Sequence, residues 1–424
     1  MRRGIRGVTA TALAAGLALA ATACGGGGDG KGGGDGKLSG TVTFWDTSND
    51  AEKATYRKLA EGFEKEHPGV DVTYVNVPFG DANAKFKNAA GGNAGAPDVM
   101  RTEVAWTADF AHLGYLAPLD GTPALDHTAD YLPQALGSTE YDGKTYSAPQ
   151  VIDTLGLFYN KQLLKKAGVS VPKTFAELES AAEKIKAKTG ATALYLRGDD
   201  PYWFLPYLYG EGGDMVDARD KNITIDDDAG TRAFATLKRL VDSKAAVTDA
   251  TDGQENQLKA LKDGDVAMAI DGPWDIEGAR AGKAFADKDN LGVAPVPGGS
   301  VAQGSPQGGW NLSVYAGSGN LNAAYAFVTY MSGADVQRKT TEQLSLLPTR
   351  KSVYQLPSVK KNEMVKFFKP AVDGAVQRPW IAEGNSLFEP VKVQMNKVLT
   401  GAATPGQAAK ATGDAYRKLL KDYK

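Results

Sequence analysis

The 424-residue chain is poor in the residues that build disulfide frameworks and most metal sites. It has one cysteine and three histidines, and the histidines, at positions 67, 112 and 127, are too far apart to bind zinc from one helix. A single cysteine excludes a disulfide framework and any cysteine-rich metal centre. We therefore expect no metal ion and no cofactor.

An excess of positive charge is also missing. The chain has 48 basic and 50 acidic side chains, and removing residues 1–23, which hold three arginines and no acid, leaves 45 basic and 50 acidic. This mild acidity is unlike the basic surface of a nucleic-acid-binding protein, so we expect no nucleic-acid partner. The composition, 42% hydrophobic and 23% charged, is that of a globular protein, and about 400 residues favour two domains or lobes over one core.

Catalytic signatures are absent as well. The sequence contains no G-x-S-x-G, no H-E-x-x-H and no EF-hand loop. Residues 143–145 are similar to the end of a P-loop, but Ser138 occupies the position of its first glycine. A carboxylate pair for glycoside hydrolysis stays open, because no spacing selects a pair among the 50 acids. We expect a protein that is not an enzyme, with an exported glycoside hydrolase as the remote alternative.

The first 37 residues have the pattern of an export and anchoring segment. Three arginines precede a short apolar run over residues 9–20, and small residues lead to Cys24. This pattern predicts a signal peptide over residues 1–23, since the apolar run is too short to span a bilayer. Cys24 resembles the lipid-modified cysteine of bacterial lipoproteins, with an ordinary signal peptide as the alternative. Residues 24–37, which are rich in glycine, predict a flexible tether on the outer face of the cell membrane.

The rest of the chain alternates between strand-like and helix-like segments. A strand over 40–45, a helix over about 51–65 and a strand over 70–77 predict a parallel pair joined by a crossover helix. Asp142-Gly143 predicts a hairpin over 141–146 with a type I′ turn. Further helices are expected near 81–90, 174–188, 228–243, 255–263, 321–332 and 391–401, and further strands near 266–270 and 311–316. The pattern predicts an α/β fold with mostly parallel sheets and helices on both faces.

Several aromatic residues stand in loop-like surroundings rather than in apolar runs. Trp203, Trp274 and Trp310 are each flanked by glycine, proline or polar residues. An aromatic face exposed in this way packs well on the C–H face of a sugar, while carboxylates and amides bind sugar hydroxyl groups. The pattern favours a carbohydrate ligand over a phosphate, a metal ion or an amino acid.

Several short motifs carry a family resemblance, in residues 41–45, 96–100, 113–119, 141–149, 157–161, 264–274 and 347–350. Through them the chain resembles the solute-binding proteins of ABC importers, in the carbohydrate cluster, and most closely the maltose/maltodextrin- and trehalose-binding lipoproteins. The order and spacing of these motifs extend over nearly the whole body of the chain. The resemblance implies a receptor that captures maltose or malto-oligosaccharides, with trehalose or another modified oligosaccharide as the alternative ligand.

The same resemblance implies an architecture and partners. The fold would have two α/β lobes, a hinge and a ligand cleft between the lobes. The N-terminal lobe would hold residues 38–152 and 310–350, and the C-terminal lobe residues 153–309 and 351–424. The protein would be a monomer that delivers its oligosaccharide to ABC permease subunits in the membrane, which a separate ATPase drives.

The family's ligand contacts map onto individual positions of this chain. Aromatic stacking would come from Trp274, Tyr202 and Trp310, with Gly309 preceding the last of these. Phe388 stands where the maltose-binding proteins carry a tryptophan. Hydroxyl groups would bind the charged and amide residues Asp153, Glu103, Asp200, Arg350 and Asn49. For each position a structural role is the alternative: a core aromatic, a capping or turn aspartate, or a hinge ion pair.

Overall fold

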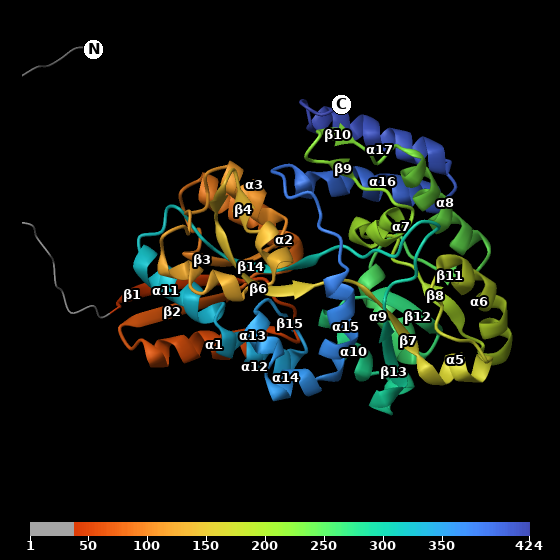
Figure 1. Ribbon diagram of the computed structural model, residues 1–424, viewed down its shortest axis with the longest axis horizontal. Helices are drawn as coiled ribbons and strands as arrows, with labels where there is room; N and C mark the ends of the chain where they lie inside the picture. Colours follow the sequence, from red (N-terminus) through yellow and green to blue (C-terminus); the bar gives the residue numbers. More distant parts are fainter. Residues whose placement is uncertain (1–37) are drawn as a thin grey trace, which may run out of the picture. The chain divides into compact units, whose positions relative to one another are not determined.

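Two β-sheets organise the chain in the computed structural model, which describes residues 38–424 (Figure 1). The expected signal peptide, Cys24 and the tether lie outside the described residues. Within residues 38–424, no helix is both long enough and apolar enough to cross a membrane.

The first sheet has six strands in the order β15-β6-β14-β3-β1-β2. Along the chain these are β1 (Gly40–Asp46), β2 (Val70–Asn76), β3 (Val99–Glu103), β6 (Ser147–Asp153), β14 (Gly308–Val314) and β15 (Leu347–Pro348). The helices of this part are α1 (Lys53–Glu66), α2 (Phe79–Gly91), α3 (Trp106–His112), α4 (Pro133–Gly137), α11 (Leu321–Met331) and α12 (Ala334–Leu344). The parallel β1–β2 pair across α1 confirms the predicted strand–helix–strand unit.

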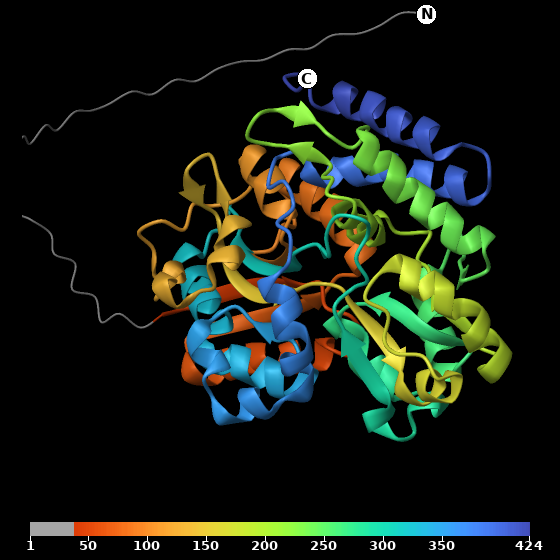
Figure 2. The same cartoon turned by 45° about the vertical axis from the view of Figure 1, so that its right-hand side comes forward.

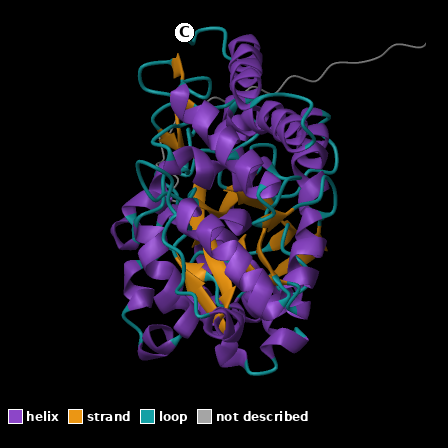
Figure 3. Ribbon diagram, turned by 90° about the vertical axis from the view of Figure 1, so that its right-hand side faces the viewer, coloured by secondary structure: helices purple, strands orange, loops and turns teal. Residues whose placement is uncertain are grey.

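The second sheet has five strands in the order β11-β8-β12-β7-β13. They are β7 (Gly156–Asn160), β8 (Thr192–Tyr195), β11 (Ala246–Val247), β12 (Val266–Asp271) and β13 (Leu291–Ala294). Its helices are α5 (Lys161–Ala167), α6 (Phe175–Thr189), α7 (Leu205–Gly210), α8 (Asp228–Asp242), α9 (Gly253–Asp263), α10 (Ile276–Arg280), α16 (Phe388–Leu399) and α17 (Pro405–Leu419). The C-terminal pair α16 and α17 lies against α8 (Figure 2). Helices surround the strands of both sheets (Figure 3).

The expectation of mostly parallel sheets is wrong. Strand β14 is antiparallel to both β3 and β6, and β7 is antiparallel to both β12 and β13. The reason is the path of the chain: β7 and β14 each enter their sheet directly from the other sheet. No crossover helix then returns them in the direction of their neighbours, as it does for β1, β2 and β3.

Three segments connect the two sheets and bond to one another, which makes them the hinge region of the fold. The first is 153–156, between β6 and β7, and the second is 304–308, before β14; in them the Thr154 hydroxyl donates to Pro306 O at 2.8 Å. The third, 374–378, follows α15 (Glu363–Asp373). Its residue Val376 exchanges backbone hydrogen bonds of 2.8 Å with Ser305 and Gln307.

Helices between the two sheets contact parts of each. The short helices α13 (Lys351–Tyr354) and α14 (Pro357–Lys361) contact α12, while α15 contacts β13, β15 and β6. One hydrophobic core therefore includes Ile152 from the first sheet, Phe158 from the second and Phe368 from α15. Separate cores lie on the outer parts of the two sheets.

Local sequence signals account for many element ends. Thr174 caps α6 through Glu177 N at 3.1 Å, and Thr404 forms a capping box with Gln407 at the start of α17. Strands β4 (Glu140–Tyr141) and β5 (Lys144–Thr145) form the predicted hairpin, with φ of 47° at Asp142 and 71° at Gly143. Both turn residues have positive φ, which confirms the type I′ turn. Strands β9 (Val216–Asp217) and β10 (Asn222–Ile223) form a second small antiparallel pair.

Candidate functional site

Polar and aromatic side chains from both sheets meet beside the hinge. We call this group the inter-sheet cluster, and its members are Glu52, Arg101, Glu103, Asp153 and Trp310 from the first sheet and its helices, Tyr202, Trp274 and Asp275 from the second, and Arg378 from the third hinge segment.

An ion pair links the third hinge segment to the first sheet. Arg378, which is 5% exposed, pairs with the Glu103 carboxylate at the end of β3, and its Nε donates to Gln307 O at 2.9 Å. The other Glu103 carboxylate oxygen accepts from Ala105 N at 2.9 Å. The guanidinium also lies 5.4 Å from the centre of the Tyr202 ring. Arg378 thus contacts groups from both sheets at once.

Asp153, the last residue of β6, is a buried carboxylate without a compensating partner. It is 4% exposed, and among the described residues nothing donates a hydrogen bond to it. Burial, reinforced by the nearby Glu103, raises its pKa to about 7, although Arg378 and Arg101 act in the opposite direction. A buried acid in this state can either accept from or donate to a ligand hydroxyl at neutral pH.

Two successive glycines let the cluster form. A Cβ at Gly308 would collide with the Asp153 carboxylate and crowd the Tyr202 hydroxyl. Gly309 has φ of 131°, and a Cβ there would meet the carbonyl of Val151. The Gly308-Gly309 pair therefore brings β14 close to β6 and sets the position of Trp310, which follows it.

Trp310 is a half-buried platform at the start of β14. Its ring packs edge-on against Phe79 and Trp106, with centroids 5.6 and 6.4 Å away. The buried Arg101 lies against it, with the guanidinium carbon 4.2 Å from the ring centre. Neighbours fix the ring while part of its surface stays free to contact a ligand.

The second sheet supplies a connected set of aromatic rings. Trp274 is half-buried in a short 3₁₀ turn, Pro273–Asp275, and meets the ring of Trp203 edge-to-face at 6.2 Å. Trp203 is buried and donates its Nε1–H to Ile270 O at 2.7 Å, and its ring also packs edge-to-face with that of Tyr202, with centroids 5.6 Å apart. Trp203 thus holds Trp274 and Tyr202 in place from behind.

Two acidic side chains of the cluster, one from each sheet, also influence each other electrostatically. Glu52, at the start of α1, has a pKa raised to about 7, chiefly by burial, and Asp275 of the second sheet contributes to that shift. Burial likewise raises the pKa of Asp275. The Glu52 carboxylate lies 3.6 Å from the Arg101 guanidinium, and the Asp275 carboxylate accepts from Gln254 Nε2 at 3.2 Å. Interactions with Arg197, Asp271 and Trp274 also act against the rise in the pKa of Asp275.

Asp200 and Phe388 line a neighbouring hollow of about 480 Å³ with Asp199, Pro201, Asn385, Ser386, Glu389 and Lys392. Asp200 accepts from Tyr202 N at 2.9 Å and so caps the turn that carries this tyrosine. The ring of Phe388 lies 5.8 Å from the Arg378 guanidinium. Through these contacts the hollow adjoins the inter-sheet cluster.

Two of the expected contact residues lie apart from the cluster. Arg350 is buried against Tyr131, and its Nε donates to Ser332 O at 2.8 Å while its Nη groups reach the carbonyls of Asp126 and His127. Asn49 is exposed, and its side-chain oxygen accepts from the backbone at Ala51 and Glu52. In the structure these are the bonds of a buried structural arginine and of an Asx turn just before α1.

Other members of the cluster were not expected from the sequence: Glu52, Arg101, Asp275 and Arg378. A signal existed for Arg101 alone, because it interrupts the otherwise apolar first half of a buried strand, Val99–Glu103. Arg378 lies in a hinge segment with no motif, and only the fold brings it to Glu103.

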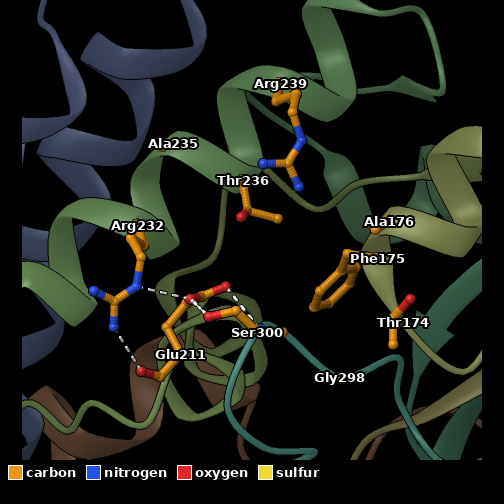
Figure 4. A pocket seen from close by; sticks show the side chains of 11 residues that line it. Thr174, Phe175, Ala176, Glu211, Arg232, Ala235, Thr236, Arg239, Gly298 and Ser300 are labelled. Carbon is orange, nitrogen blue, oxygen red and sulfur yellow. Dashed lines mark hydrogen bonds and ion pairs between the residues drawn. The ribbon is translucent and has the colours of Figure 1, made fainter.

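A second hollow, of about 240 Å³, lies away from the cluster on the second sheet's helices (Figure 4). Phe175 lies on one side of it, opposite Glu211 and Ser300, and Arg239 extends from α8 (Figure 4). Glu211 accepts from the Ser300 hydroxyl and from Arg232 Nε, the latter at 2.9 Å. In the described part of the chain, no group of three or more His, Cys, Asp or Glu is arranged to hold a metal ion.

Comparison with known proteins decides the family. Residues 47–338 match the model of the bacterial extracellular solute-binding protein family. The chain belongs to this family.

Relatives share the fold along nearly the whole chain. The GacH receptor of Streptomyces glaucescens, solved without ligand and with acarbose and an acarbose homologue, is 73% identical, with a TM-score of 0.90 over 91% of this chain and 100% of that one. The diacetylchitobiose-binding protein DasA of Streptomyces coelicolor is 26% identical over 91% of both chains. A maltooligosaccharide ABC transporter solute-binding lipoprotein of Streptococcus pneumoniae is 25% identical over 88% of both. The two-lobe fold with a hinge is thus the fold of a receptor family, as the sequence resemblance implied.

Proposed function

We propose that this protein is the extracellular binding component of an ABC sugar importer, which captures maltose or malto-oligosaccharides between its two lobes and delivers them to a membrane permease. We assign residues 38–152 and 310–350 to one lobe, around the first sheet, and residues 153–309 and 351–424 to the other, around the second. The boundary residues Asp153, Gly308 and Gly309 still belong to strands of the first sheet. Residues 351–373 contact elements of both sheets, and the cleft between the lobes is the inter-sheet cluster with its adjoining hollow.

One observation carries the proposal: aromatic faces and uncompensated carboxylates converge from both sheets beside the hinge. Trp310 and Asp153 come from one side, and Tyr202 and Trp274 from the other. A sugar offers an apolar face to an aromatic ring and hydroxyl groups to carboxylates, so one ligand can bridge both lobes. Such bridging favours the closed state of a hinged protein, since a ligand shifts the population toward the state it binds better.

The relatives support an oligosaccharide as the ligand. The pneumococcal relative is named for maltooligosaccharides, DasA for diacetylchitobiose, and the S. glaucescens receptor was solved with acarbose. A modified oligosaccharide such as acarbose is therefore a second candidate, favoured by the 73% identity of that receptor. Trehalose remains a third.

Calorimetric titration of residues 38–424 tests these candidates with maltose, maltotriose, acarbose, trehalose and cellobiose. This segment forms one compact unit. Micromolar binding, about −8 kcal/mol, of maltose or maltotriose supports the proposal. Tighter binding of acarbose or trehalose changes the ligand and keeps the receptor role. No binding to any of the five, or hydrolysis of maltotriose by the pure protein, overturns it.

Export and anchoring belong to the same proposal. We propose that residues 1–23 are removed, that Cys24 carries the lipid, and that residues 25–37 tether the monomer near a permease driven by a separate ATPase. Replacement of Cys24 by alanine should release the protein from membranes into the medium in a bacterial host. Retention of this variant on the membrane contradicts the lipid anchor.

A further inference from the structure

Arg101 is a cation in the interior of the first sheet. It lies on β3 with no exposed surface. Its Nε donates to Gln150 Oε1 at 2.9 Å, and its Nη2 donates to the Tyr56 hydroxyl at 3.2 Å. Burying a guanidinium is costly unless its charge and donors are compensated, so the position needs a reason.

Hydrogen bonds alone do not compensate the buried positive charge of Arg101. Its Nη1 is buried and has no hydrogen-bond partner among the described residues, and the nearest carboxylate oxygen, that of Glu52, is 3.6 Å away. Two aromatic faces make up the environment: the guanidinium carbon lies 4.2 Å from the centre of Trp310 and 4.5 Å from that of Tyr56. The cation therefore lies against the aromatic platform and beside the Glu52 carboxylate of the inter-sheet cluster.

The second sheet repeats this arrangement. Arg197, which is 5% exposed, lies with its guanidinium carbon 4.1 Å from the centre of Trp203, the ring that holds Trp274 and Tyr202 from behind. Its Nε donates to Asp199 at 2.7 Å, and its Nη1 is again buried without a hydrogen-bond partner among the described residues. Each lobe thus supports its ligand-facing aromatic residues on a buried arginine.

Arg350 provides a contrast within the first lobe. It is as buried as Arg197 and lies 4.2 Å from the centre of the Tyr131 ring. Its donors, however, reach backbone carbonyls and the Tyr131 hydroxyl, and none of these partners belongs to the inter-sheet cluster. Burial and stacking are alike for the three arginines. They differ in the ring on which they stack, because Trp310 belongs to the inter-sheet cluster and Trp203 contacts two of its rings, whereas Tyr131 lies outside it.

We propose that Arg101 is a positioning residue for sugar recognition, which holds the Trp310 ring and the Glu52 carboxylate in their binding geometry, and that Arg197 does the same in the second lobe through Trp203. The inference rests on the proposed sugar-binding function and adds residues that need not touch the ligand. A tryptophan ring that is already fixed in the free protein loses little side-chain freedom when the sugar binds, so less of the binding free energy is lost to ordering it. Lysine is a poor replacement for Arg101, because only a planar guanidinium can lie flat on the ring while its fixed donors reach Gln150 and Tyr56.

Substitution of each arginine by lysine tests the proposal, because lysine keeps the charge and protects the fold. We expect Arg101→Lys to weaken maltotriose binding about 10-fold, Arg197→Lys about 3-fold because one ring intervenes, and Arg350→Lys less than 2-fold. Melting temperatures of the three variants separate lost stability from lost affinity. The Arg350→Lys control is matched in burial and in distance to its ring.

A double-mutant cycle shows whether Arg101 acts through Trp310. If it does, Arg101→Lys should change maltotriose binding by less than 3-fold once Trp310→Ala is present, because the ring it positions is gone. A full 10-fold loss in that background overturns the proposal, as does an equal loss of affinity in Arg350→Lys. If the unmodified protein binds none of the five sugars, the proposed function fails first and this inference fails with it. If the unmodified protein binds a sugar other than maltotriose, that sugar becomes the probe.

Discussion

Two buried carboxylates of this protein differ in their hydrogen bonds and in the direction of their pKa shifts. Asp153 lies in the inter-sheet cluster, and Glu211 lines the hollow of Figure 4. Glu211 accepts hydrogen bonds from Ser300 and Arg232, and these bonds lower its pKa despite its burial. Asp153 has no donor of its own among the described residues, and burial raises its pKa to about 7. A carboxylate that the fold has fully bonded serves the fold, while one left without donors is available to a ligand.

The same contrast extends to the surroundings of the two sites. The inter-sheet cluster combines half-buried tryptophans with incompletely paired acids from both sheets, beside the segments that can bend. The hollow of Figure 4 is lined by helices of the second sheet and by the loop at 298–300, and each of its charged side chains has an ion-pair partner: Arg232 pairs with Glu211, and Arg239 pairs with Glu179. Each of the following experiments tests whether this difference separates a binding site from a structural depression.

Removing an aromatic ring that packs on the sugar should have the largest effect on affinity. We expect Trp274→Ala to weaken maltotriose binding by about 100-fold, because a central aromatic contact contributes more than any other side chain in such sites. Its control is Val301→Ala, which trims an exposed apolar side chain next to Ser300 of the other hollow and should leave affinity unchanged. Calorimetry measures both variants. An unaltered affinity in Trp274→Ala would place the ligand elsewhere.

Replacing Asp153 and Glu211 by their amides should have different effects: the first variant should lose sugar affinity, and the second should lose stability. We expect Asp153→Asn to weaken sugar binding about 10-fold and to leave the melting temperature at pH 7.5 unchanged or higher, since a poorly compensated charge is removed. Glu211→Gln should instead cost about 1–3 kcal/mol of unfolding free energy with an unchanged dissociation constant. Chemical denaturation and calorimetry on both variants provide the comparison. Loss of affinity in Glu211→Gln would make the second hollow part of the site.

The pH dependence of stability should show the same division. Asp153 and Glu52 have raised pKa values, so the folded state binds their protons more tightly than the unfolded state, and their stabilising contribution is lost as pH rises through about 7. Between pH 8 and pH 6 each should add about 1 kcal/mol to the unfolding free energy. Glu211, whose pKa is lowered, loses its contribution only in acid, below the range scanned.

Denaturation curves at pH 6, 7 and 8 measure this slope. Asp153→Asn should make the slope shallower, whereas Glu211→Gln should leave it intact. A flat profile in the unmodified protein would mean that neither Asp153 nor Glu52 takes up its proton near neutral pH.

The sequence could predict much of this architecture because its signals are local. The strand–helix–strand start and the Asp142-Gly143 turn follow from short-range patterns and appear as expected. Strand directions could not be predicted in the same way, because β7 and β14 obtain theirs from the hinge connections and not from their own residues.

The residues of the candidate site likewise fall into two groups: those that the sequence can locate and those that only the tertiary fold brings together. Trp274 ends one of the motifs that carry the family resemblance, and the resemblance also maps Trp310 and Asp153 onto ligand contacts. Arg378 reaches Glu103 from 275 positions away, a contact that only the tertiary fold defines. Arg350 is the reverse case. It stands in a motif of the family resemblance, but its side-chain donors bond to backbone carbonyls, and no sequence pattern reveals these bonds.

The smallest effect should come from the rim of the second hollow. Arg239 pairs with Glu179 at 2.8 Å, but about half of the arginine side chain is exposed, so water already competes for the interaction. We expect Arg239→Ala to change the unfolding free energy by less than about 0.5 kcal/mol and to leave sugar affinity unchanged. Together with Glu211→Gln, this variant examines the second hollow at its rim and in its interior. If either one reduces maltotriose affinity while stability holds, paired charges are not a reliable sign of a structural role in this fold, and the contrast with Asp153 loses its meaning.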